Sequence, residues 1–290
     1  MLLTIVSLWV SIYVINKAIC HYTNLFKLDE TATTLILGDS HSKFAFNDHI
    51  ISGSFNYSDN ADSYFYSYVK LKAIHKKNPQ IDTLLLSFSE HNMESRIEEL
   101  WTLNEGHLNK RMPLYGPLLG LEDALFLLEH APESLFKNLF GQVLFPIYYL
   151  AKGQGLFGGF RELNQNTLAA EIEMERATPS KKQAVFEVAE LECRYILKIE
   201  DYCVKNGIKL LLVNPPVYPL IHARQANVYG PYKKYFSHIP FLDFSQLPLS
   251  DADFADMVHL SPKGARHFSE MIENDGLMNF ANSNNALISN

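Results

Sequence analysis

The sequence has few cysteines and no excess of basic charge. Three cysteines among 290 residues are too few for a disulfide framework. Cys193 and Cys203 fall in one predicted helix, where ten residues of rise separate them by about 15 Å, beyond the reach of a disulfide. The formal net charge of −7 gives no electrostatic footprint for nucleic acid. These absences argue against a disulfide scaffold and against a nucleic-acid-binding protein.

Cofactor and metal motifs are absent as well. The glycine cluster at 153–159 contains neither the Gly-x-Gly-x-x-Gly of a dinucleotide loop nor the Gly-Lys-Ser/Thr of a phosphate loop, so it predicts a flexible turn. The histidines show no ligand spacing such as His-Glu-x-x-His. We therefore expect no cofactor and no metal. Short basic runs such as Lys76–Lys77 are interpreted as solvated faces.

The longest apolar run lies at the N-terminus. Leu2–Ile15 is shorter than the roughly 20 residues that a spanning helix prefers, but it is long enough for an anchor or a signal-peptide core. We expect residues 1–20 to form a membrane anchor or signal-like segment, with a buried core helix as the alternative. Lys17 and Lys27 follow the run, so the positive-inside rule alone would keep the domain cytoplasmic. Because that bias is small, we expect the domain to face the periplasm or the cell exterior.

Short apolar runs then alternate with helical patterns, and the length fits one α/β domain with insertions. We predict strands at Thr33–Leu37, Phe55–Ser58, Ile81–Leu86, Ile208–Val213 and Phe241–Phe244. We predict helices at Tyr64–Lys77, capped by Asp62 or Ser63, at Lys181–Asn206, ended by Gly207, and at Pro262–Asn274, capped by Ser261. The domain should span residues 31–276, with a helical insertion at 93–180 over the strand ends and a polar tail at 277–290.

The first strand stops at Gly38-Asp39-Ser40, which makes Ser40 the candidate nucleophile. Open α/β sheets place their ligands at the carboxyl ends of the strands, where this hydroxyl would lie. Asp39 is expected to stabilise the turn through bonds from its side chain to the backbone. His41 follows as a possible supporting group.

A second stretch, from Asp253 to Gly264, supplies the two groups that a serine nucleophile needs. The imidazole of His259 would take the proton of the Ser40 hydroxyl. Asp256 lies three residues earlier, where it would accept from the other ring nitrogen and balance the imidazolium. Only the tertiary structure can bring the two stretches together.

Taken in this order, the two stretches resemble the first and last blocks of the SGNH (GDSL-type) hydrolase family. The resemblance spans Leu35 to Phe268 and implies a flavodoxin-like, three-layer α/β/α sandwich with about five parallel strands, doubly wound, that works without a cofactor. The N-terminal helix and the helical insertion would be additions to this fold.

The resemblance also implies where an oxyanion hole would be built. In the family, a glycine backbone after the second strand is one donor, and Asn60 or Ala61 occupies that place here. An asparagine from Gly-x-Asn-Asp after the third strand is another donor, but this chain has Ser89 at that position. Asn92 or His91 would have to reach back in its place. We expect Asn60, Ser89 and Asn92 to contribute, with His91 in support.

As a membrane-anchored member, the chain resembles enzymes that add or remove O-acetyl groups on cell-envelope glycans. The resemblance thus implies a serine esterase or O-acyltransferase that forms an acyl-enzyme, with an acylated glycan or lipid as substrate and a membrane-bound acyltransferase as a potential partner. One alternative is an envelope protein that keeps the fold but binds a glycan or a partner without turnover. Another is a lipase or lysophospholipase that draws its substrate from the bilayer.

Overall fold

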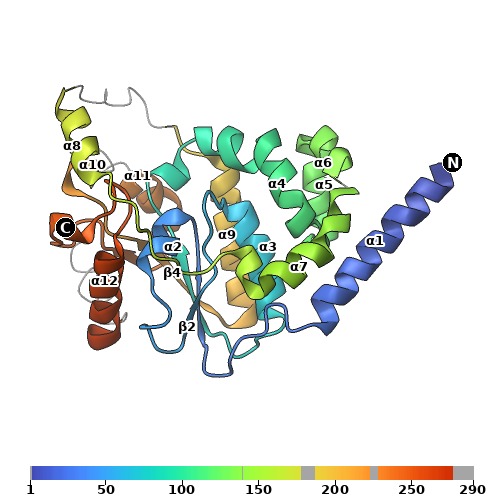
Figure 1. Ribbon diagram of the computed structural model, residues 1–290, viewed down its shortest axis with the longest axis horizontal. Helices are drawn as coiled ribbons and strands as arrows, with labels where there is room; N and C mark the ends of the chain where they lie inside the picture. The colour runs from blue at the N-terminus through green and yellow to red at the C-terminus, as the bar shows by residue number, and fades with distance from the viewer. Residues whose placement is uncertain (1, 139, 178–186, 223–227, 277–290) are drawn as a thin grey trace.

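Five short apolar segments pair side by side into one parallel sheet (Figure 1). The computed structural model describes residues 2–138, 140–177, 187–222 and 228–276. The strands are β1 (Thr34–Leu37), β2 (Ser54–Asn56), β3 (Thr83–Ser87), β4 (Lys209–Asn214) and β5 (Phe241–Asp243), in the order β2-β1-β3-β4-β5. All neighbouring pairs are parallel, so the predicted sheet of about five parallel strands is confirmed.

Both faces of the sheet are buried, as expected of a parallel sheet whose crossovers place helices on each side. Leu35 and Leu37 of β1 belong to one core cluster, whereas Ile36 between them belongs to the other. The first core lies under α3 (Tyr64–His75) and α9 (Glu190–Asn206), which pack on each other. The second lies under α2 (Ser40–Ala45) and α12 (Pro262–Asp275). The chain is thus an α/β protein with helices on both faces of the sheet.

Two helix boundaries show where local patterning sufficed and where it did not. The helix predicted from Lys181 begins at Glu190 in the structure, because Val188 forms an isolated bridge with Glu94 instead of continuing the helix. Residues 181–186 lie outside the described part of the chain. The predicted end is correct: Gly207 has a φ of 70°, the left-handed conformation that terminates many helices.

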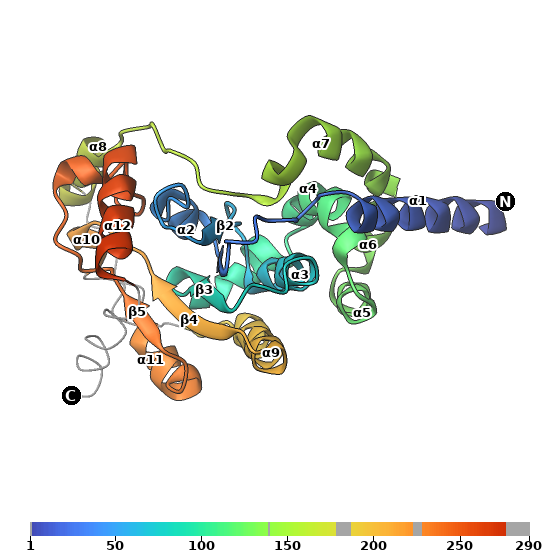
Figure 2. The same ribbon diagram turned by 90° about the horizontal axis from the view of Figure 1, so that it is seen from below.

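Helices fill the stretch between β3 and β4, where an insertion was predicted. The longer ones are α4 (Glu105–Tyr115), α5 (Leu121–His130), α6 (Pro132–Asn138), α7 (Phe145–Lys152) and α8 (Leu168–Ala177). Figure 2 shows α4 to α7 together on one side of the sheet, while α8 lies at the other end beside α12. The shorter elements are η1 (His91–Met93), η2 (Glu98–Thr102), η3 (Gly116–Leu118), η4 (Phe140–Leu144), η5 (Gly153–Phe157), α10 (Pro219–His222), α11 (Tyr229–Pro231), η7 (Tyr232–Phe236) and η8 (Asp251–Asp253).

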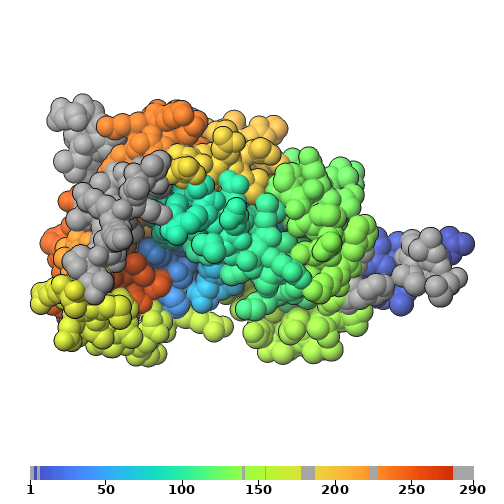
Figure 3. Space-filling view, turned by 90° about the horizontal axis from the view of Figure 1, so that it is seen from above, coloured from blue at the N-terminus to red at the C-terminus, as the bar shows by residue number. Residues whose placement is uncertain are grey.

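The N-terminal segment forms α1 (Leu2–Tyr22), which projects from the side that carries the insertion (Figure 3). Its second half is docked: the buried Asn16 side chain donates to the carbonyl of Gln142 at 2.7 Å. Among the described residues, no helix combines the length and the apolar character needed to cross a bilayer. The structure therefore does not show the anchor predicted at 1–20. The polar tail predicted at 277–290 lies outside the described residues.

Candidate active site

Ser40 lies at the carboxyl end of β1, as the first residue of α2. The backbone before it lies so close to the neighbouring strand that only glycine fits at position 38. A Cβ atom on Gly38 would lie 2.2 Å from the Cβ of Ser87. Asp39 caps α2, and its Oδ1 accepts from the backbone N–H of His41 at 3.0 Å. Asp39 therefore bonds to the backbone as predicted, and β1 delivers the Ser40 hydroxyl to the sheet edge.

The loop before α12 carries His259 and Asp256. Ser261 caps α12 and accepts from the N–H of Gly264 at 3.2 Å, with Pro262 in the first turn, as predicted. Gly264 is required by packing, because a Cβ there would lie 1.9 Å from the carbonyl oxygen of Asp253. These contacts fix the loop against the start of α12.

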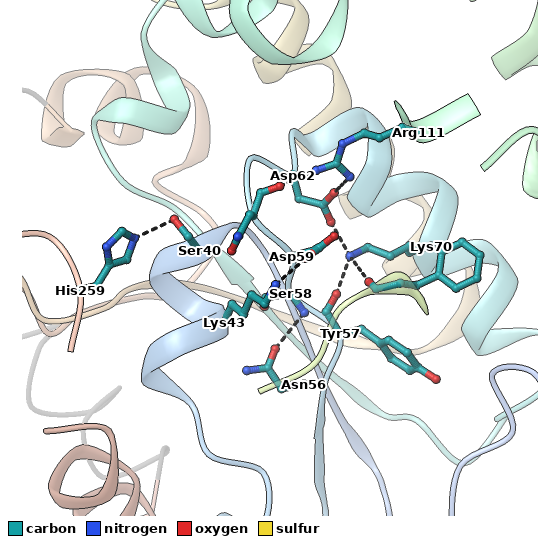
Figure 4. Close-up of polar contacts among 12 residues, drawn as sticks. Ser40, Lys43, Asn56, Tyr57, Ser58, Asp59, Asp62, Lys70, Arg111 and His259 are labelled. Carbon is teal, nitrogen blue, oxygen red and sulfur yellow. Dashed lines mark hydrogen bonds and ion pairs between the residues drawn. The ribbon is translucent and has the colours of Figure 1, made fainter. Parts of the chain in front are cut away.

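The two stretches meet, as the hypothesis of a serine nucleophile with a histidine base requires. His259 Nε2 lies 2.8 Å from Ser40 Oγ, and His259 Nδ1 lies 2.9 Å from Asp256 Oδ2 (Figure 4 shows the Ser40–His259 contact). The Oδ1 atom of Asp256 accepts from the N–H groups of Val258 and His259, each at 2.8 Å. Burial opposes ionisation of Asp256, but the hydrogen bond and charge of His259 together with these N–H groups outweigh it and lower its pKa. An ionised Asp256 holds His259 with Nε2 toward the serine.

The end of the insertion braces this loop, which the sequence did not indicate. Gln165, in the segment that leads into α8, donates from Nε2 to Asp256 Oδ2 at 3.3 Å. Glu171 of α8 accepts from the N–H of Met257 at 3.0 Å. The segment 165–171 thus acts on the orientation of the carboxylate that faces His259.

The residues predicted to follow β3 gather around Asp39. Asn92 donates from Nδ2 to Asp39 Oδ2 at 2.9 Å, and His91 Nε2 is hydrogen-bonded to the same oxygen. The Ser89 hydroxyl donates to Asn92 Oδ1 at 2.6 Å and lies 2.8 Å from His91 Nδ1. Burial alone would raise the pKa of Asp39, but the two neighbouring imidazoles and these donors hold it well below its usual range. Ser89 and His91 are therefore bound within this network rather than to Ser40.

His41 lies in a row of three imidazoles. Its ring centroid is 4.2 Å from that of His91 and 5.2 Å from that of His259. Burial lowers the pKa of His41 to about 3, with a smaller contribution from the charge of His91. At neutral pH His41 is therefore an uncharged group that packs behind the base.

Asp39, His41 and His91 form the one cluster among the described residues that offers three potential metal-ligand atoms within 4.8 Å of one another. Hydrogen bonding already accounts for the Asp39 carboxylate, since its oxygens accept from a backbone N–H and from two side chains. The cluster thus has a structural explanation as the support of the Ser40 turn.

The loop at 57–62 lies beside Ser40 and carries the other predicted oxyanion position. The N–H of Asp59 donates to the carbonyl of Gly38 at 3.0 Å, which ties this loop to the serine turn. Asn60 is exposed, and Ala61 has a φ of 53°, a left-handed conformation that is uncommon for a residue with a side chain. Within the described residues, no hydrogen bond is recorded for the backbone N–H of Asn60 or Ala61. These N–H groups remain available to a ligand.

A buried charge cluster holds this loop, and none of its basic members was predicted (Figure 4). Arg111 of α4 donates to the carbonyl of Asn60 and to the Asp62 carboxylate. Lys70 of α3 forms an ion pair with Asp62 and donates to the carbonyl of Tyr57. Asp62 thus pairs with two cations, while Ser63, the other expected cap, occupies the N-cap position of α3 without a capping bond from its side chain. In the sequence, Lys70 among the apolar residues of its helix is a weak signal for such a cluster. Arg111 in the insertion gives no signal.

A family model without a functional description matches residues 166–280, which is less than half of the chain. The match includes Asp256 and His259 but not Ser40. No curated protein matches the chain.

Proposed function

We propose that this protein is a serine esterase or O-acyltransferase of the SGNH type, which acts through an acyl-enzyme on Ser40. The observation that carries the proposal is the chain of contacts from Ser40 Oγ to His259 Nε2 at 2.8 Å and from His259 Nδ1 to Asp256 Oδ2 at 2.9 Å. Strand order β2-β1-β3-β4-β5 with the serine after β1 supports it, since ligands of such sheets bind where the strand order reverses.

In the proposed reaction, Ser40 Oγ attacks the carbonyl carbon of an ester while its proton moves to His259 Nε2. The tetrahedral intermediate collapses, the bond to the leaving alkoxide breaks, and His259 returns the proton to that oxygen. Water or an acceptor hydroxyl then gives its proton to His259 and attacks the acyl carbon on Ser40. The bond between that carbon and Ser40 Oγ breaks, and His259 returns the proton to Oγ. Asp256 stays ionised throughout and stabilises the imidazolium. Hydrolysis and transfer differ only in the final acceptor.

The oxyanion would be bound by the backbone N–H groups of Ser40 and Ala61 and by the side-chain amide of Asn92. Of the side chains predicted to donate, we assign this role to Asn92 because its amide is held beside the Ser40 turn. Its Oδ1 accepts from Ser89, which fixes the orientation of the amide, and one Nδ2 hydrogen goes to Asp39, next to Ser40. The second Nδ2 hydrogen is then the donor that we assign to the oxyanion.

Arg111 would act as a positioning residue for the Ala61 donor. The carbonyl of Asn60 and the N–H of Ala61 belong to one planar trans peptide, so they point in opposite directions. Because Arg111 holds the Asn60 carbonyl on its own side, the Ala61 N–H points away from Arg111. In the view of Figure 4, Ser40 and Arg111 lie on opposite sides of Asp62.

The substrate that we propose is an O-acetyl group of a cell-envelope glycan. The resemblance to SGNH enzymes that act on cell-envelope glycans supports this class. The uncharged His41 near the serine suits a small, uncharged acyl group.

Labelling with a fluorophosphonate, followed by peptide mapping, tests the function. We expect covalent label on Ser40 in the folded protein and none on Ser40→Ala, because only a hydroxyl activated by His259 attacks phosphorus at a useful rate. Turnover of an activated acetyl ester should disappear in the same variant. Equal labelling of both proteins would reject the proposal.

A further inference from the structure

A basic pocket lies far from Ser40, at the opposite end of α3. Its volume is about 530 Å³, and it opens between α1, the end of α3 and the turn at η3. Lys17 and His21 line it from α1, and Lys72, Lys76 and Lys77 line it from the end of α3. The active-site loop leads into the first turn of α3, whose 12 residues span about 18 Å. The pocket is therefore a separate site.

Backbone carbonyls hold two of these lysines in place. Lys17 donates from Nζ to the carbonyl of Leu119 at 3.1 Å, and Lys77 donates from Nζ to the carbonyl of Thr23 at 2.7 Å. Each ammonium has three N–H donors, so each keeps donors that these bonds do not use. The ammonium groups are thus positioned before any ligand arrives.

The positive charge of the pocket is largely uncompensated. No aspartate or glutamate lines it, and Lys72 alone has a carboxylate partner, Asp123 at 2.7 Å. For Lys17, Lys76 and Lys77, no ion pair is recorded within the described residues. Lysines at a helix C-terminus are common because they interact with the helix dipole, but this does not account for Lys17, which comes from α1. Three lysines that have no ion pair within the described residues thus line one pocket of a chain whose net charge is −7.

Apolar groups form the rest of the pocket and continue beyond it. Phe26, Ala73, Pro117 and Leu118 line the wall beside the lysines. From there α1 extends away from the body of the protein (Figure 1), and its exposed side chains include Leu3, Leu8, Val10, Val14 and Ile15. Cationic groups beside an exposed apolar helix match a ligand with an anionic head and an apolar tail.

We propose that this pocket binds the phosphate group of an anionic ligand, which Lys17, Lys76 and Lys77 contact together. The run Lys76–Lys77, predicted as a solvated face, becomes part of a site only because α1 adds Lys17 beside it. The apolar surface of α1 favours the head group of an anionic phospholipid as the source of the phosphate. A soluble phosphate presents the same chemistry, and the experiment distinguishes the two.

The test compares the full-length protein with the variant Lys17→Gln/Lys76→Gln in flotation with vesicles. One set of vesicles contains phosphatidylglycerol in phosphatidylcholine, and the other contains phosphatidylcholine alone. Each lysine near an anionic surface accounts for about a 5-fold change in affinity, so we expect the double variant to bind phosphatidylglycerol vesicles about 25-fold more weakly. Binding to phosphatidylcholine, which reports on the apolar surface of α1, should be equal for both proteins.

Lys110→Gln/Lys233→Gln is the matched control, because it removes the same charge from exposed positions outside the pocket. The single variant Lys76→Gln removes no hydrogen bond or ion pair known among the described residues. It therefore tests the pocket even if the double variant fails to fold. Titration with inorganic phosphate, followed by calorimetry, forms the second arm. The parent protein could bind inorganic phosphate, and the pocket variant lose this binding, while both bind the two kinds of vesicle equally. That result would support the site with a soluble phosphate as its ligand. Equal behaviour of parent, pocket variant and control in both arms would overturn the proposal.

Neither outcome depends on Ser40 chemistry. Fluorophosphonate labelling of the same proteins reports separately on the proposed function.

Discussion

Arg111→Met gives the sharpest test of how the active-site loop works. The substitution keeps the length of the side chain but removes the donors to the Asn60 carbonyl and to Asp62. Asp62 keeps its ion pair with Lys70, so the loop should remain in place. The peptide between Asn60 and Ala61 should then become free to rotate, and the oxyanion of the proposed reaction would lose a fixed donor.

The expected size of the effect follows from two limits. A hydrogen bond to a charged group contributes roughly 1.5–3 kcal/mol, which bounds how strongly Arg111 holds the peptide. Complete loss of one oxyanion donor lowers kcat by about 10²–10³-fold. Because the Ala61 N–H stays nearby and only its orientation is released, we expect kcat to fall by roughly 10- to 100-fold with little change in KM.

Kinetics on an activated acetyl ester, combined with thermal unfolding, provide the measurement. Arg111→Lys keeps the charge but not the forked geometry, so it should restore the melting temperature more than it restores kcat. Arg96→Met is the matched control, since Arg96 is an exposed arginine that pairs with Glu94 away from the loop. A fall in melting temperature with an unchanged kcat would show that Arg111 stabilises the fold only, and the positioning role would be refuted.

Three further predictions concern single side chains. Asn92→Ala should lower kcat by about 10²-fold or more at unchanged KM, and near-full activity on the acetyl ester would remove Asn92 from the oxyanion hole. Asp256→Asn should lower kcat by about 10⁴-fold, because His259 loses the carboxylate that fixes its tautomer; a loss of less than tenfold would contradict the assigned role. Glu192 is buried, and burial raises its pKa to about 7. Since the unfolded carboxyl ionises near its ordinary value, stability should fall as the pH rises from about 4.5 to 7, and chemical denaturation of Glu192→Gln should show a flatter profile.

The sequence alone predicted the elements that depend on local patterns. The apolar run before Gly38 has to be buried on both faces, so it becomes a central strand of a parallel sheet. Ser261 followed by Pro262 sets the start of α12, and Gly207 sets the end of α9, because caps act within one helical turn. The spacing of Asp256 and His259 was equally local, so their mutual contact could be anticipated.

Contacts between distant segments were decided by the tertiary structure. Ser40 and His259 are 219 residues apart, and their meeting was inferred from the order of two motifs rather than from any local property. Ser89 and His91 were candidates for the oxyanion hole, but both belong to the hydrogen-bond network around Asp39. A side chain at a strand end can reach several neighbours, and the sequence does not say which of them it contacts. The amide of Asn92 is oriented by Ser89 and, among the described residues, donates to Asp39.

The charge clusters were decided in the same way. Asp62 or Ser63 was expected to cap α3, and Ser63 occupies the N-cap position. Asp62 is instead enclosed by Lys70 and by Arg111, which comes from the insertion. A buried carboxylate needs such partners, but a sequence does not state which distant cation supplies the second one. Likewise, the sequence around Lys76 predicts only a solvated face, and Lys76 belongs to a basic pocket because the end of α1 brings Lys17 to the same pocket. Local patterns determine elements and caps, whereas paired charges and pockets arise from segments that only the fold brings together.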